Sequence, residues 1–241
     1  MPAAYDQDLA YIHDVGFGAF ARDAAPGLLA MLRQRGVAGG CVVDLGCGSG
    51  IWAARLVRAG YRVVGVDQSA AMIALAHRRA PRAILRQQSF LDAELPACDA
   101  VTSIGECFNY RFDARVGEQS LARLFRNVHT ALRRGGLFIF DVATPGRGAG
   151  PTMRNFSGRT WAILTDVHED TRLRVLTRRI TSFRKLGNAY RRNEETHRLR
   201  LYKPLTIAVM LRRAGFRAHI VRGYGHLRFS PGHRGFVARK P

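Results

Sequence analysis

The chain has 241 residues, of which 47% are hydrophobic, so we expect one α/β domain with a substantial core and room for a small subdomain. No apolar run approaches a membrane span of about 18 residues, and residues 1–8 are polar, which favours a cytoplasmic protein without a signal peptide. The formal net charge is +20, and the excess lies in residues 151–241, where 21 basic side chains accompany 5 acidic ones.

Residues 1–36 are predicted to form a helical cap ahead of the first strand. The apolar spacing indicates two helices, at residues 5–15 and 24–35. Asp23 is placed to cap the second helix, and Pro26 would fall in its first turn, where a proline is tolerated.

A glycine-rich turn follows the first predicted strand, residues 41–45. Glycine recurs there at alternate positions, Gly46, Gly48 and Gly50, directly before an apolar helix. Glycine is required where the backbone takes a positive φ or comes very close to a ligand. We therefore expect a ligand to lie over this turn.

Two carboxylates narrow the identity of that ligand. Asp67 directly follows the second predicted strand, residues 62–66, where it can accept hydrogen bonds from a ribose diol. Asp44 precedes the glycines, and its charge would repel a diphosphate but suits a cationic ligand. The spacing is G-x-G-x-G, which differs from the G-x-G-x-x-G of dinucleotide sites. A cationic nucleoside is the ligand that these residues favour.

Residues 44–50 resemble the first motif of the class I S-adenosylmethionine-dependent methyltransferases. The resemblance implies S-adenosylmethionine as cofactor and S-adenosylhomocysteine as product. It also implies that Gly46, Cys47, Gly48 and Gly50 pass under the methionine part of the cofactor, while Asp67 holds the ribose hydroxyls. The alternative is a glycine-rich turn in another α/β fold.

The rest of the core alternates strands with helices, which predicts a doubly wound sheet with right-handed crossovers. In the resemblance this is a Rossmann-like sheet of seven strands with a reversed last strand, its cofactor-binding core lying at 37–150. The predicted elements are helices 50–59, 69–79, 116–132 and 204–214 and strands 84–88, 98–104, 137–142, 217–224 and 234–239, with residues 204–241 completing the sheet.

Ligands of such a sheet lie at the carboxyl ends of its strands. Gln68 follows the second strand, and Met72 is placed either against the adenine or in the core. Many members of the family have an aspartate after the third strand, for the adenine amino group. This chain has Ser89 and Phe90 there, so we expect the Ser89 hydroxyl or the Phe90 backbone amide to replace it. Tyr11 is expected to belong to a lid over the cofactor.

The loop after the fourth strand begins at Ile104 and, in the resemblance, lies beside the methionine end of the cofactor and the methyl acceptor. Glu106, Asn109 and Tyr110 are its candidate substrate-binding residues, although Glu106 could instead cap the next helix. The loop lacks the Asp/Asn-Pro-Pro-aromatic motif of enzymes that methylate planar nitrogens of nucleic-acid bases, which argues against an adenine or cytosine N-methyltransferase.

Methyl transfer needs a base only when the acceptor carries a proton that must leave. We predict Glu106 and His197 for this role, with His13 and His226 as further candidates. A single histidine on a helix or strand is more often a structural residue, and that alternative stays open for each of them.

From Gly158 to Leu201 the apolar residues recur with a period of two, and Gly187 with Asn188 indicates a hairpin turn, which predicts a lid insert at residues 151–203. We expect an antiparallel insert of about three strands after the fifth core strand. It resembles the roof over the active site of glycine/sarcosine and sugar-amine N-methyltransferases. Trp161 is a candidate substrate-binding residue of this roof.

The four cysteines, at positions 41, 47, 98 and 107, form no Cys-x-x-Cys pair, so we expect reduced thiols with no disulfide and no metal site. Of the 38 basic residues, 35 are arginine, which is typical of a GC-rich genome and also compatible with an anionic partner.

The sequence therefore predicts methyl transfer to nitrogen or oxygen of a small molecule. An RNA methyltransferase using the arginine-rich insert and a non-catalytic cofactor-binding protein are the alternatives. The sequence leaves the acceptor and the oligomeric state undetermined.

Overall fold

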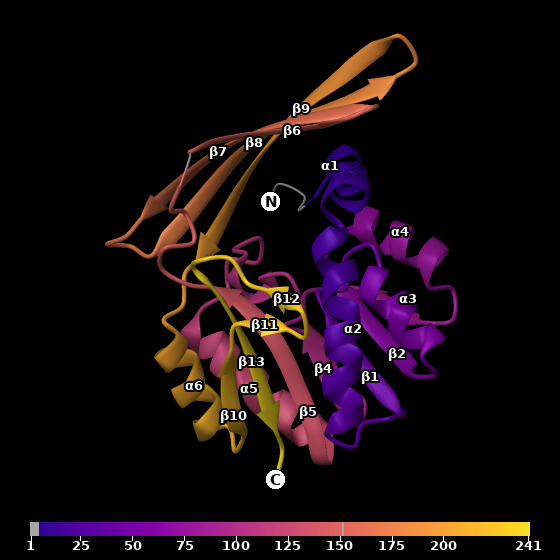
Figure 1. The fold of residues 1–241 in the computed structure, drawn as a ribbon, viewed down its shortest axis with the longest axis vertical. Coiled ribbons are helices and arrows are strands. Elements are labelled where there is room, and N and C mark those ends of the chain that lie inside the picture. Colours follow the sequence, from indigo (N-terminus) through magenta and orange to yellow (C-terminus); the bar gives the residue numbers. More distant parts are fainter. Residues whose placement is uncertain (1–4, 151) are drawn as a thin grey trace.

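The computed structural model describes residues 5–150 and 152–241. Figure 1 shows two layers of structure, a helix-covered sheet and a second, four-stranded sheet above one end of it. Within the described residues, no helix is long and apolar enough to cross a membrane.

The core is a seven-stranded sheet with the order β10-β13-β5-β4-β1-β2-β3. Strands β1 to β5 pair in parallel, and β13 is antiparallel to both of its neighbours. The predicted fold class, with a reversed last strand, is confirmed. The strands are β1 (Cys41–Leu45), β2 (Arg62–Asp67), β3 (Ile84–Gln87), β4 (Cys98–Ser103), β5 (Leu132–Ala143), β10 (Arg217–Val221) and β13 (His233–Arg239).

Helices cover both faces of this sheet because successive strand residues point to opposite sides. Val42 of β1 packs with helices α2 (Ala19–Gln34) and α3 (Ile51–Arg58). Val43 packs on the other face, with helices α5 (Glu118–Ala131) and α6 (Pro204–Arg213). Helix α4 (Ala70–Arg79) connects β2 to β3.

The insert after β5 has four strands, one more than the sequence predicted. They form an antiparallel meander of β6 (Met153–Gly158), β7 (Trp161–Asp170), β8 (Val175–Leu186) and β9 (Ala189–Arg200). Strand β6 lacks a clear apolar alternation because five of its six residues are exposed and it lies at the edge of the sheet. Its pairing with β7 defines it as a strand.

The N-terminal segment differs from the prediction of two separate helices. Helix α1 (Gln7–Ile12) is capped by Asp6, whose carboxylate accepts hydrogen bonds from the Asp8 and Leu9 amides. A π-helical turn at His13–Phe17 then leads into α2. The predicted helix start at Ala24 is wrong, because α2 already begins at Ala19, so Asp23 and Pro26 lie inside it.

The segment joins the two sheets. Asp8 is 1% exposed, and Arg184, Arg191 and Asn193 of the insert donate hydrogen bonds to it. In Figure 1, α1 lies between the insert and α4. A further two-stranded hairpin, β11 (Gly223–Tyr224) and β12 (Leu227–Arg228), precedes β13.

Candidate active site

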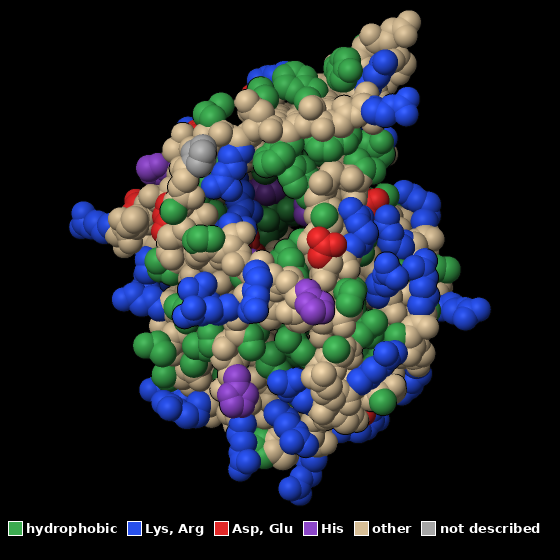
Figure 2. All heavy atoms as spheres, in the orientation of Figure 1, with side chains coloured by type: hydrophobic (Ala, Val, Ile, Leu, Met, Phe, Trp, Pro, Cys, Tyr) green, Lys and Arg blue, Asp and Glu red, His purple; other side chains and the backbone are tan. Residues whose placement is uncertain are grey.

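A cavity of about 520 Å³ lies between the carboxyl ends of the core strands, the N-terminal segment and the insert. Figure 2 shows its mouth as a dark hollow beneath the overhanging four-stranded sheet. The predicted cofactor residues that line it are Asp44, Gly46, Cys47, Gly48, Asp67, Gln68, Met72, Phe90 and Ile104.

The three positions of the turn require glycine for different structural reasons. All three have positive φ, at +75° for Gly46, +52° for Gly48 and +76° for Gly50. A Cβ on Gly46 would lie 2.6 Å from the sulfur of Cys107, and one on Gly50 would lie 3.0 Å from Ala76. A Cβ on Gly48 would meet no atom within 4 Å. Gly46 and Gly50 therefore permit local packing, whereas Gly48 leaves the cavity floor open.

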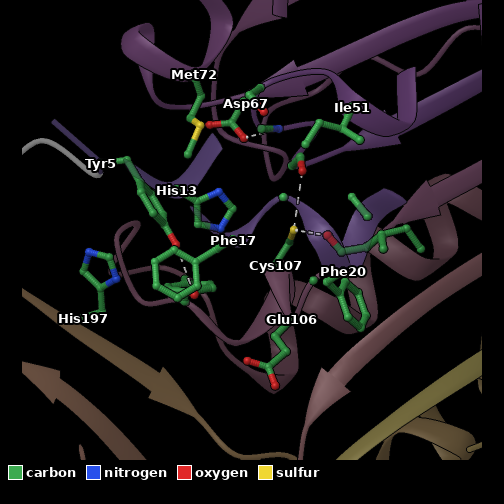
Figure 3. Close-up of a pocket in the computed structure, with 18 of the residues that line it drawn as sticks. Tyr5, His13, Phe17, Phe20, Ile51, Asp67, Met72, Glu106, Cys107 and His197 are labelled. Atoms are coloured by element: carbon green, nitrogen blue, oxygen red, sulfur yellow. Dashed lines mark hydrogen bonds between the residues drawn. The ribbon is translucent and has the colours of Figure 1, made fainter. Parts of the chain in front are cut away.

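Asp67 lies at the end of the cavity opposite Glu106, with Met72 beside it (Figure 3). Its carboxylate accepts a hydrogen bond from the Gly48 amide at 2.9 Å and another from the Ser69 amide at 2.9 Å. Burial raises the pKa of Asp67, and these amides oppose the rise. Because a carboxylate has about four acceptor positions, Asp67 keeps acceptor capacity for a ribose diol.

Asp44 is 2% exposed and accepts a hydrogen bond from the Thr102 hydroxyl at 2.8 Å. Burial, with a smaller contribution from the charge of Asp67, raises its pKa to about 7 against the opposing effect of Thr102. A cation placed near this carboxyl would favour its ionised form.

These residues fit S-adenosylmethionine. Asp67 offers acceptors for the ribose, and the carboxyls of Asp44 and Asp67 make this end of the cavity favourable for a cation. Gly48 and Gly105 provide open backbone surface, since a Cβ on either would meet nothing within 4 Å.

Three predicted cofactor residues lie away from the cavity wall. Gly50 packs against α4 at Ala76. The Ser89 hydroxyl donates to Asp113 at 2.7 Å, so it is already committed within the protein. The hydroxyl of Tyr11 pairs with that of Thr160 at 3.2 Å, and the Arg184 guanidinium lies over its ring. Tyr11 thus joins the N-terminal segment to the insert.

Glu106 lines the cavity but is not a free carboxylate. It forms ion pairs with Arg147 and with Arg178, the latter at 3.1 Å. Burial would raise the pKa of Glu106, but Arg178 and Arg147 hold it below its usual value. Such a carboxylate is a weak proton acceptor. Its side chain makes no helix-capping hydrogen bond, so the capping alternative is not observed either.

The other predicted substrate residues separate in the structure. Tyr110 lines the cavity, where its hydroxyl accepts from Arg178 at 3.1 Å and lies 3.3 Å from that of Tyr5. Asn109 is fully buried, and its amide bonds to the backbone of Ala143 and Arg200, which ties the loop to β5 and β9. Trp161 packs on Phe17, with ring centroids 5.9 Å apart, outside the cavity lining.

Two of the candidate histidines line the cavity and one does not. His197 is 1% exposed, and its Nε2 lies 2.8 Å from Glu195. Burial lowers the pKa of His13 to about 4, so His13 is neutral at pH 7. His226 is exposed in the β11–β12 hairpin, outside the cavity lining.

Arg147 and His233 also line the cavity, and sequence reasoning singled out neither of them. His233 begins β13, and its Nε2 lies 2.8 Å from Asp141 of β5. Asp141 and His233 are 92 residues apart, so no local spacing could have paired them.

Comparisons with known proteins agree with this geometry. Residues 42–136 match a family described as a methyltransferase domain. Glycine N-methyltransferase of Rattus norvegicus is 34% identical over 131 residues, which cover 47% of this chain and 43% of the rat protein. Ubiquinone biosynthesis O-methyltransferase of Methylobacterium sp. is 32% identical over 151 residues, covering 62% of this chain and 54% of that protein.

Solved structures share the fold over nearly the whole chain. A sugar N-methyltransferase from Streptoalloteichus sp. superposes with a TM-score of 0.80 and 21% identity, covering 100% of this chain and 95% of that one. An S-adenosylmethionine-dependent methyltransferase from Clostridium acetobutylicum gives a TM-score of 0.82 and 20% identity, covering 96% and 97%. At this identity the likeness shows the fold alone.

The chain spans about half, or less, of the length of the curated relatives described above. The match over residues 42–136 contains the glycine turn, Asp67 and the loop after β4. Residues 42–136 therefore carry a methyltransferase domain, and the chain as a whole shares the fold of an S-adenosylmethionine-dependent methyltransferase of known structure.

Proposed function

We propose that this protein transfers a methyl group from S-adenosylmethionine to a nitrogen or oxygen atom of a small molecule. The observation that carries the proposal is the roofed cavity of about 520 Å³, which lies in the size range of small-molecule sites. Both the glycine turn and the inner face of the insert contribute to its wall, so cofactor and acceptor would share one water-poor space.

The cofactor supplies the methyl group, and the protein residues hold and orient the reactants. Asp67 would bind the ribose, Met72 and Phe90 would flank the adenine, and Asp44 would face positive charge. Holding an acceptor close to the methyl carbon and away from water provides much of the acceleration of such a displacement.

The acceptor end of the cavity has the opposite charge character from the cofactor end. Arg147, Arg154 and Arg178 line the cavity, and Arg147 and Arg178 pair there with Glu106. The relatives offer two precedents of acceptor class, because one is named a glycine N-methyltransferase and another a sugar N-methyltransferase. Both names support a small, polar acceptor for this chain.

The outer face of the insert gives little support to the RNA alternative. Arg179 pairs there with Asp166 at 3.5 Å, and Arg192 pairs with Glu194. Arg184 and Arg191 point to the inner side, where Asp8 binds both. Acidic side chains thus pair with these four arginines of the insert, which lowers the positive charge that they offer to phosphates.

The test is a labelling experiment with S-adenosylmethionine that carries a tritiated methyl group. The protein is incubated with a panel of small amines, amino acids and hydroxyl compounds, and separately with total transfer RNA. We expect label in a small molecule, with little dependence on salt. Label in RNA alone, with turnover falling steeply as salt increases, would favour the RNA alternative. Calorimetric cofactor binding without transfer to any acceptor would support the non-catalytic one.

A further inference from the structure

A histidine and a carboxylate that the sequence did not connect meet on the cavity wall. His233 of β13 lines the cavity, and its Nε2 lies 2.8 Å from Oδ1 of Asp141 in β5. Asp141 is fully buried and His233 is 4% exposed. The two residues belong to neighbouring antiparallel strands, so the sheet itself holds them together.

Asp141 also holds the loop that faces the methyl acceptor in the resemblance. Its carboxylate accepts from the Gly105 amide at 3.0 and 3.1 Å, from the Glu106 amide at 2.7 Å and from the Tyr224 hydroxyl at 3.2 Å. With these donors directed at it, the carboxylate acts as an acceptor, and Nε2 of His233 carries the hydrogen of their bond. The neutral ring then has its lone pair on Nδ1.

Two contacts define the orientation of the ring. Phe229 stacks on the imidazole with centroids 4.3 Å apart, and Phe20 stacks at 5.4 Å. In residues 5–150 and 152–241, no hydrogen bond to Nδ1 is found, and Nδ1 is not among the buried polar atoms without a partner. Nδ1 is therefore accessible to the cavity.

We propose that His233 accepts the proton of the methyl acceptor and that Asp141 positions its ring. This inference rests on the proposed function and names the residue that would complete it. The acceptor is a hydroxyl compound or a protonated amine, because only these have a proton that must leave.

Bonds and protons balance in this step. The acceptor atom forms its new bond to the methyl carbon, and its proton passes to Nδ1 of His233. The electron pair of the broken N–H or O–H bond stays on the acceptor atom, while that of the broken methyl–sulfur bond stays on sulfur. Asp141 stabilises the imidazolium through Nε2–H, and the proton then leaves to solvent.

The position of His233 distinguishes it from the other candidates. Glu106 is held in two ion pairs with a lowered pKa. His197 lies on the roof, and its partner Glu195 also accepts from the Tyr5 and Asp6 amides of the N-terminal segment. Through Asp141, His233 is connected instead to the Gly105 and Glu106 backbone beside the methionine end of the cofactor site.

The first test needs no turnover. Nitrogen-15 spectra of the histidine rings, assigned through the variant His233→Gln, report the tautomer in the cofactor-free protein. We expect wild-type His233 to carry its hydrogen on Nε2, and Asp141→Asn to change that distribution. A wild-type ring with its hydrogen on Nδ1 would overturn the inference.

The second test measures how the single-turnover rate depends on pH, for methylation of the small molecule that the tritium experiment labels. The affinity for S-adenosylhomocysteine is the parallel readout. His233→Gln should lower the rate by about 10²–10⁴-fold and abolish the pH dependence, while the affinity stays within about twofold. His226→Gln, on the neighbouring hairpin outside the cavity, is the matched control. The inference fails if His233→Gln keeps the wild-type profile or if His197→Gln alone removes it. If the wild-type protein does not bind S-adenosylhomocysteine, the result would instead contradict the proposed function.

Discussion

Asp14 and Arg79 form an ion pair in which both carboxylate oxygens accept a hydrogen bond, at 2.6 and 2.8 Å. Asp14 belongs to the π-helical turn of the N-terminal segment and Arg79 ends α4. Ser49 of the glycine turn joins the pair, because its hydroxyl donates to Asp14 and its carbonyl accepts from Arg79. The pair therefore ties the segment that closes the cavity to the turn expected to carry the cofactor.

Arg79→Ala should weaken S-adenosylmethionine binding although Arg79 does not line the cavity. The side chain of Asp14 is only 10% exposed, and the change removes the charged partner of its carboxylate. We expect this to loosen the N-terminal segment, which closes the cavity. We expect about a fivefold to tenfold loss of affinity by calorimetry, which corresponds to about 1 kcal/mol, the net contribution of one ordinary hydrogen bond. Arg78→Ala, at the exposed neighbouring position, should bind like the wild type. Equal affinities for the two variants would show that the N-terminal segment is not coupled to the cofactor site.

Gly48→Ala should separate cofactor binding from stability. Alanine at a φ of +52° costs about 1–2 kcal/mol of folding free energy, and its methyl group would project into space left open on the cavity floor. Gly187→Ala is the matched control, since it has a φ of +60°, equally open surroundings and a place in the β8–β9 turn. Both variants should lower the melting temperature similarly, and only Gly48→Ala should lose cofactor affinity. Retained affinity in Gly48→Ala would place the cofactor elsewhere.

Asp67→Ala should weaken S-adenosylmethionine binding at least tenfold. Hydrogen bonds to a charged group contribute about 1.5–3 kcal/mol each, and Asp67 is placed to accept from both ribose hydroxyls. Adenine alone has no ribose, so its weaker binding should change little in the same variant. Unchanged calorimetric affinity for S-adenosylmethionine would reject the assignment of Asp67.

Asp44 should make the stability of the cofactor-free protein depend on pH. Its pKa is about 7 in the folded chain, against 3.8 for an unperturbed aspartate, so the folded protein holds this proton more tightly than the unfolded chain does. The resulting stabilisation is complete below pH 3.8 and is lost as the pH rises through 7. We expect Asp44→Asn to lose less stability than the wild type between pH 5 and about 8 in chemical denaturation.

The same carboxyl should release protons when S-adenosylmethionine binds near pH 7, because the cation favours its ionised form. Calorimetry in buffers of different ionisation enthalpy measures that release. Asp44→Asn should show less of it, and an identical release in both proteins would exclude Asp44 as the source.

The cofactor end of the site could be predicted because its chemistry is local. Gly46, Gly48 and Asp67 meet through one strand, one turn and the next strand, and a short loop allows few arrangements of such residues. Alternation of strands and helices likewise predicted the parallel core, since a right-handed crossover allows few topologies. The insert was placed correctly, but the exposed edge strand β6 carried no apolar signal.

The acceptor end was decided by the tertiary structure. Asn109 had the polarity of a substrate ligand, but β5 and β9 take up its amide. The sequence placed Glu106 where a base is expected, but in the structure two arginines from distant segments pair with it. Asp141 and His233 had no sequence signal, because only the pairing of β5 with the reversed strand β13 brings them together. By itself the sequence determined the glycine turn and Asp67 at the expected cofactor end of the cavity, through residues close along the chain. Only long-range packing decided which side chains line the other end of the cavity, because those contacts join segments that no local spacing relates.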